Sequence, residues 1–151
     1  MVTRVFRIVV LVAACTVSMA GCGRMYTVIG RVVQMQPGLE AGIHEVESPR
    51  KLSAGNPVSD ATVVLYFELD NEGNPRRDSS WQRQVQVEHD GSFEIRDYAK
   101  PGSEAILGIE VLAPGWETQY TAYVDYYDPD DQFFLIVMPA ETPSHDDVPG
   151  G

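Results

Sequence analysis

The stretch from Gly55 to Asp70, GNPVSDATVVLYFELD, decides the fold of this chain. Its second half places an apolar residue at every other position: Ala61, Val63, Leu65, Phe67 and Leu69. A period of two is typical of a β-strand with one buried face, and β-branched and aromatic side chains suit a pleated surface. Turn-forming glycine, proline, asparagine and aspartate lie on both sides of the run. Such a strand requires neighbours in its own sheet and a second sheet over its apolar face.

Further runs of strand character lie on both sides of this stretch. Trp81 to Glu88 alternates most cleanly and precedes the pair Asp90-Gly91, which is typical of a β-hairpin. Glu104 to Ala113 is almost wholly apolar, as expected of a strand covered on both faces. The other runs are Tyr26 to Val33, Phe93 to Ile95, Thr118 to Tyr126 and Gln132 to Met138. Short strands separated by turn signals predict an all-β fold, a seven-stranded antiparallel Greek-key β-sandwich over residues 26–138.

Two segments depart from this pattern. Residues 34–56 form an insertion that is longer than most loops in compact domains, and Ile43 to Val46 is the run within it that has strand character. A long insertion between two good strands is either a disordered flap or a site of function. Residues 139–151 contain three prolines and little to bury, which predicts a flexible tail.

The first 21 residues have the layout of a secretory signal, with a basic start, an apolar run from Ile8 to Val17 and small residues before a cysteine. The apolar run is short for a span across a bilayer of about 30 Å. Its end, Met19-Ala20-Gly21-Cys22, resembles the lipobox of bacterial lipoproteins. That resemblance implies cleavage before Cys22 and a diacylglyceryl thioether on its sulfur, usually with an N-acyl chain. The alternative is an ordinary secretory signal followed by an incidental cysteine.

A lipid on Cys22 has consequences for the rest of the chain. Residues 22–25 become a short tether, and Gly23 in place of an aspartate favours the outer membrane over the inner one in lipoproteins of this kind. Because Cys15 is lost with the signal, the mature domain has no thiol left for a disulfide. Loss of the two signal arginines moves the formal net charge from −11 to −13, which argues against nucleic acid as a partner.

Four pieces of the chain, taken in order, resemble the carboxypeptidase regulatory-like domain, which is also called transthyretin-like or prealbumin-like. They are Val28-Ile-Gly-Arg-Val32, Gly55-Asn-Pro-Val-Ser-Asp-Ala-Thr-Val-Val-Leu65, His89-Asp-Gly-Ser-Phe-Glu-Ile95 and Val111-Leu-Ala-Pro-Gly-Trp-Glu117. The resemblance implies a sandwich that serves beside enzymes or in surface proteins as a folding, docking or spacing module. It carries no catalytic set. The insertion at 34–54 and the wide gap from Asp70 to Ser80 depart from the family pattern.

Two sets of residues have the chemistry of metal ligands. His44 and Glu47 have the H-x-x-E spacing of zinc carboxypeptidases, but an open catalytic zinc needs three fixed ligands, so we interpret this match as chance. The acidic loop supplies oxygen ligands of the kind that Ca²⁺ prefers, from Asp125, Asp128, Asp130 and Asp131. Its spacing differs from that of an EF-hand. A solvated acidic loop that protects a sheet edge is the alternative.

Aromatic residues cluster in the second half of the chain and could form a recognition surface for a sugar or a protein. They are Trp81, Trp116, Tyr120, Tyr123, Tyr126 and Tyr127. Tyr120 and Tyr126 share a strand face with Ala122 and Val124, so we expect at least half of the six, these two among them, in the core. Trp116 follows a Pro-Gly turn and could cap the sandwich instead.

The sequence contains no Ser-His-Asp or Cys-His set and no phosphate-binding glycine loop. It therefore predicts a non-catalytic envelope protein without a cofactor, anchored by lipid on the periplasmic or cell-surface side of a membrane. We expect it to act as a docking or structural module with a protein partner. The alternative is a ligand-binding module for glycan or calcium that uses the loop at 125–131 and the aromatics near it.

Overall fold

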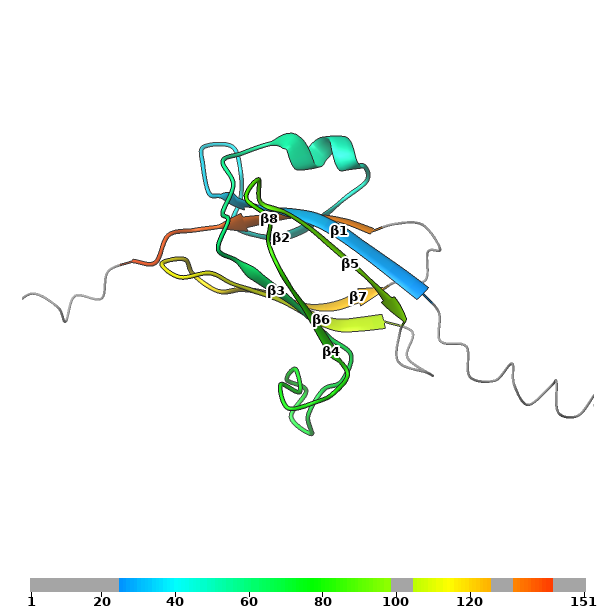
Figure 1. Cartoon of the computed structure of the whole chain (residues 1–151). Helices are drawn as coiled ribbons and strands as arrows, with labels where there is room; N and C mark the ends of the chain where they lie inside the picture. The colour runs from blue at the N-terminus through cyan, green and yellow to red at the C-terminus, as the bar shows by residue number, and fades with distance from the viewer. Residues whose placement is uncertain (1–24, 99–104, 126–131, 143–151) are drawn as a thin grey trace, which may run out of the picture.

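The computed structural model describes residues 25–98, 105–125 and 132–142. Two four-stranded sheets pack face to face, and we call them the first and the second sheet (Figure 1). The first has the order β2-β8-β1-β5, and the second has the order β4-β3-β6-β7. The strands are β1 (Met25–Gln34), β2 (Gly42–Val46), β3 (Thr62–Tyr66), β4 (Gln82–Gln86), β5 (Ser92–Tyr98), β6 (Ala105–Leu112), β7 (Gln119–Asp125) and β8 (Gln132–Met138). The predicted all-β sandwich is confirmed.

The sandwich differs from the prediction in two respects. It has eight strands where the sequence predicted seven, because β2 within the insertion joins the edge of the first sheet beside β8. It is also not wholly antiparallel. β1 runs parallel to β8, in a register that extends from Val28 opposite Gln132 to Gln34 opposite Met138.

The core lies between the two sheets and is built from the alternate positions that the sequence indicated. Ala61, Val63 and Leu65 are fully buried, whereas Leu69 lies beyond the end of β3 and is exposed. The opposite side of β3 is also buried, at Val64 and Tyr66. Burial on both sides makes β3 a central strand, and its two neighbours are β4 and β6.

The turn between β4 and β5 forms, but the strands that it joins do not pair with each other. The Glu88 amide donates to the Ser92 carbonyl at 2.9 Å, and Gly91 has a φ of 82°, which glycine adopts at little cost. The Val32 amide then donates to the Gly91 carbonyl at 2.8 Å. That bond aligns β5 with β1 in the first sheet while β4 stays with β3 in the second. The predicted hairpin is therefore a connection between the two sheets.

An ion pair links the two strands after they separate. Arg83 on β4 donates through Nε to Asp97 on β5, and this hydrogen bond is the main reason that the pKa of Asp97 lies below its usual range. Arg83 occupies a position on the apolar side of its strand in the sequence pattern. Its partner on the opposite sheet explains why a charged residue is tolerated there.

The insertion covers the outer face of the first sheet at β1 and β8. Its 3₁₀ helix η1 (Pro49–Ser53) lies over that face in Figure 1 and buries Leu52. Leu52 forms a second apolar cluster with Val33, Leu135 and Val137. Arg31 on β1 donates through Nη1 to the Leu52 carbonyl at 3.1 Å, which holds η1 against the sheet. The predicted loop is thus an ordered cover with a strand of its own.

The start of the predicted tail is also ordered. The Glu117 amide donates to the Pro139 carbonyl at 2.9 Å, and the Glu141 amide donates to the Gly115 carbonyl at 3.1 Å. These bonds attach residues 139–142 to the turn between β6 and β7. Residues 143–151 lie outside the described part of the chain.

The two ends of the described chain lie at opposite ends of the sandwich (Figure 1). Met25 begins β1 opposite Tyr98, the last residue of β5. The paired residues Ala105 and Asp125 and the start of β8 at Gln132 lie at this same end. The predicted acidic loop therefore leaves and re-enters the sandwich at its N-terminal end.

We predict that Leu52→Ala lowers the free energy of unfolding by about 2 kcal/mol, the lower end of the range for a buried leucine, because the cluster under η1 is small. Leu69→Ala is the matched control, since Leu69 is exposed and its truncation should change stability by less than about 0.5 kcal/mol. Urea unfolding followed by far-UV circular dichroism measures both. Equal stability of the two variants would show that the insertion does not support the sheet.

Candidate functional site

The outer face of the second sheet is exposed along its two edge strands, β4 and β7, and at the end of β6. Gln84 on β4 and Ala122 on β7 are exposed, and Leu112 on β6 is 36% exposed. On the first sheet the insertion covers the outer face at β1 and β8, and Glu94 and Arg96 on β5 are exposed. The second sheet differs in having a buried charged residue on its outer face.

A buried glutamate lies on this outer face. Glu110 is the cross-strand neighbour of Val64 on β3 and of Tyr120 on β7, and it is only 4% exposed. The Tyr66 hydroxyl donates to Glu110 Oε2 at 2.7 Å, and Arg77 Nη2 donates to Glu110 Oε1 at 2.6 Å. A buried carboxylate is costly unless it is paired and hydrogen-bonded, and here each oxygen has a donor.

The surroundings of Glu110 shift the acidity of its neighbours. Burial, followed by the hydrogen bond to Glu110, raises the pKa of Tyr66 to about 12. The hydrogen bond to the same carboxylate raises the pKa of Arg77. Burial and the charge of Glu110 raise the pKa of Tyr120. Both tyrosines therefore stay neutral, and Arg77 stays charged, across the physiological range.

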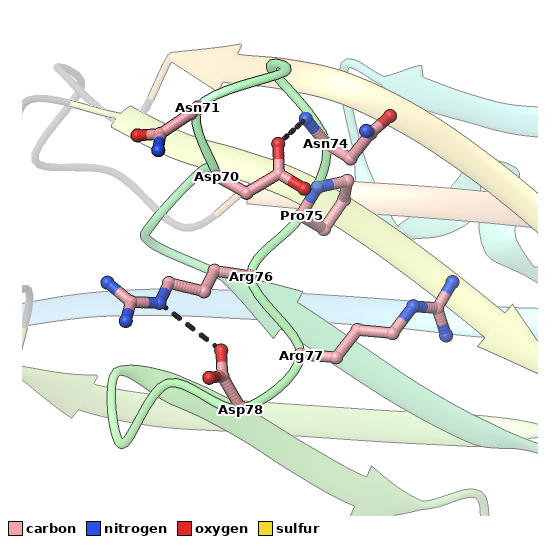
Figure 2. Close-up of a pocket in the computed structure, with 7 residues that line it drawn as sticks. All are labelled: Asp70, Asn71, Asn74, Pro75, Arg76, Arg77 and Asp78. Carbon is pink, nitrogen blue, oxygen red and sulfur yellow. Dashed lines mark hydrogen bonds and ion pairs between the residues drawn. The ribbon is translucent and has the colours of Figure 1, made fainter.

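Arg77 also lines a hollow of about 580 Å³ formed by the loop between β3 and β4 (Figure 2). The other lining residues are Asp70, Asn71, Asn74, Pro75, Arg76 and Asp78. Figure 2 shows the two arginines extending in opposite directions, with Arg76 paired to Asp78 at 3.2 Å. Arg77 therefore connects the hollow with Glu110 on the sheet.

The loop that forms the hollow is closed by its own hydrogen bonds. Asp70 Oδ1 accepts from the amides of Glu72 and Asn74, each at 2.9 Å, in an Asx-type turn. The bond from the Asn74 amide is the main reason that the pKa of Asp70 lies below its usual range. Further along, the Arg76 amide donates to the Glu68 carbonyl at 2.9 Å. The wide gap noted in the sequence is thus a folded loop.

The predicted calcium ligands lie mostly outside the described residues. Asp125 is the last residue of β7, and Asp128, Asp130 and Asp131 fall in the segment 126–131 that the structure does not describe. In the described ranges, no group of three or more histidine, cysteine, aspartate or glutamate residues has the arrangement of a metal site. Calcium binding by the acidic loop stays a prediction.

His44 and Glu47 have local partners. His44 lies on β2, and its Nε2 forms a hydrogen bond of 2.8 Å with the Glu40 carbonyl. Glu47 pairs at the surface with Lys51 at 3.3 Å. The two residues of the H-x-x-E match therefore take part in separate surface contacts.

The aromatic residues of the predicted recognition surface whose side chains the structure describes, Trp81, Trp116 and Tyr120, lie in different surroundings. Trp81 and Trp116 are partly buried and pack against the core. Tyr120 is 44% exposed, so the expectation that it packs in the core is wrong: its face of β7 is the outer one. The side chain of Tyr123 is not among those described, and Tyr126 and Tyr127 lie in the undescribed segment.

Cys22 precedes the described residues, so its predicted lipidation is not visible in the structure. Within residues 25–98, 105–125 and 132–142, no helix has the length and apolar character needed to cross a membrane. The lipid anchor at Cys22 stays a prediction from the sequence.

Comparison with known proteins does not assign the chain to a family. No family model matches it, and no curated protein matches it. One similar solved structure is the dioxygenase domain of a dioxygenase carbohydrate-binding protein fusion from the cellulolytic bacterium Streptomyces sp. SirexAA-E. It is 16% identical, with a TM-score of 0.43, over 80% of this chain and 81% of the other. A likeness at this level carries no functional argument.

We predict that Arg77→Ala lowers the free energy of unfolding by about 1–3 kcal/mol, because it leaves the buried Glu110 with one donor fewer. Arg76→Ala is the matched control: the same substitution, one residue away, removes only an exposed pair and should cost less than about 0.5 kcal/mol. Chemical unfolding at neutral pH measures the two variants. Indistinguishable losses would contradict the pairing of Arg77 with Glu110.

The raised pKa of Tyr66 predicts a stability change in alkaline solution. The phenol stays protonated in the folded chain up to about pH 12, whereas in the unfolded chain it ionises near its ordinary pKa of 10.0. The stabilisation of the folded chain by this phenol is therefore complete below pH 10 and is lost as the pH rises to 12. Tyr66→Phe should unfold more easily at pH 8 but lose less stability between pH 10 and 12. Parallel stability profiles for the two chains would contradict this assignment.

Proposed function

We propose that this chain is a non-catalytic, lipid-anchored envelope protein that acts as a docking or structural module. The observation that carries the proposal is the position of β1. This strand begins at Met25, three residues after Cys22, and lies in the middle of the first sheet between β8 and β5. An anchor on Cys22 would therefore be joined directly to the most protected part of the fold.

The short tether determines which part of the sandwich faces the lipid. Three residues span about 10 Å when extended, so the N-terminal end of β1 would stay close to the membrane surface. Two or three acyl chains on Cys22 would hold it there stably, because each buried methylene contributes about 0.8 kcal/mol. The outer membrane is the proposed location, with the domain on its periplasmic or cell-surface side. The strands would then extend away from the membrane and expose their outer faces sideways.

The chemistry of the second sheet supports a docking role over a catalytic one. Both carboxylate oxygens of Glu110 accept hydrogen bonds, from Tyr66 and Arg77. A general base or nucleophile must be within reach of a substrate, and this carboxylate is only 4% exposed and held by two partners within the protein. The cluster is therefore suited to holding the outer face in shape for a partner.

We expect the mature full chain, extracted from membranes, to have the mass of a protein that begins at Cys22 and carries a diacylglyceryl group. Cys22→Ala should abolish the lipid and release the protein from the membrane fraction. Cys15→Ala is the matched control, since Cys15 lies in the segment that the proposal removes. Mass spectrometry and fractionation measure these outcomes. Mature protein with an unmodified Cys22 would overturn the anchor.

A further inference from the structure

One tyrosine of the second sheet lies sideways across its neighbouring strand. Tyr120 is on β7, at the edge of the sheet, and its phenol end lies above Gly108 of β6. A Cβ atom added to Gly108 would be 2.8 Å from Tyr120 Cε2 and 2.9 Å from its hydroxyl oxygen. Because glycine leaves this space free, the ring can lie along the sheet. It is still 44% exposed.

The cross-strand neighbour of Tyr120, Glu110, is neutralised by Arg77 at 2.6 Å, although the chain as a whole has a formal net charge of −11. The rest of the face offers amides and hydroxyls in register across β4 and β3. Gln82 lies opposite Tyr66 and Gln86 lies opposite Thr62.

The hollow beside the sheet continues this chemistry. Asn71 and Asn74 project from the two limbs of its loop in Figure 2, which places an amide on each side. Arg77 donates through Nη2 to Glu110, but its side chain is 66% exposed and has further N–H donors that face solvent. We take the ring, the amides and this arginine together as one candidate surface, because Arg77 joins the hollow to Glu110, the cross-strand neighbour of Tyr120.

We propose that this surface, centred on Tyr120, binds a neutral glycan chain. The C–H face of a pyranose ring is apolar and fits the exposed face of a tyrosine, while its hydroxyls match amide and guanidinium partners that both donate and accept. Glu110, the carboxylate beside Tyr120, is only 4% exposed and is hydrogen-bonded within the protein at both oxygens, so it does not favour a cation at the ring. A polyanion would meet a strongly acidic protein.

This inference deepens the proposed docking function by naming what is docked. It relies on the proposed anchor only for the location of binding, which would be beside a membrane-attached sandwich. The binding surface itself depends on residues 66–120. The two proposals therefore fail independently: an unmodified Cys22 would remove the anchor and leave glycan binding unchanged.

Affinity electrophoresis of the full-length chain in mild detergent tests the proposal. The gels contain hydroxyethyl cellulose, xylan, glucomannan or mixed-linkage β-glucan as neutral probes, with carboxymethyl cellulose as the anionic comparison. We expect at least one neutral polysaccharide to retard the protein. Tyr120→Ala should weaken that retardation by about tenfold or more, because the stacking ring is lost, whereas Tyr120→Phe should retain it.

Two further variants separate recognition from folding. Tyr98→Ala is the matched control, because Tyr98 is 62% exposed on β5 in the other sheet, and its loss should leave binding unchanged. Gly108→Ala should weaken binding several-fold with unchanged thermal unfolding, since the new methyl group displaces only the movable end of Tyr120. The proposal is overturned by retardation in the anionic gel alone, by no retardation in any gel, or by retardation that survives Tyr120→Ala.

Discussion

The parallel pairing of β1 with β8 is the constraint on which the rest of the structure depends. Parallel neighbours cannot be joined by a tight turn, so the whole chain between Gln34 and Gln132 has to be accommodated before the pair closes. β3, β4, β6 and β7 use that length to build the second sheet. Because both cysteines precede residue 25, only apolar burial and ladder hydrogen bonds hold the pair together. Val32 and Ile136, opposite each other in the pair, are accordingly fully buried.

The outer faces of the two sheets differ in the side chains they carry and in what covers them. The first sheet has apolar residues there, at Val33, Leu135 and Val137, and the insertion covers them with Leu52. On the outer face of the second sheet, the described residues include the buried carboxylate of Glu110, which Arg77 neutralises from a loop. The covered apolar face serves stability, whereas the edge strands of the second sheet keep exposed amide and aromatic side chains that a ligand can reach. This division is why the proposed docking surface lies on the second sheet.

The sequence predicted the candidate site only in part. Glu110 is a lone charge within the apolar run AILGIEVL, which signals a paired residue in a buried strand. Its partners could not be named, because Tyr66 and Arg77 are 44 and 33 residues away and meet it only after the sheet has formed. The exposure of Tyr120 could not be predicted from the sequence either. An alternating strand has two faces, and nothing local says which of them will meet the second sheet.

The period of two and the turn residues determined by themselves that this chain is an all-β sandwich, with β8 at Gln132–Met138 and a buried β3 within Gly55 to Asp70. Those features are local, since they depend on side-chain alternation and backbone preference over a few residues. Tertiary structure alone decided the parallel pair, the placement of β4 and β5 in different sheets, and the use of the insertion as a cover. Each of these depends on which distant apolar surfaces can be buried together, and that is a property of the assembled sheets.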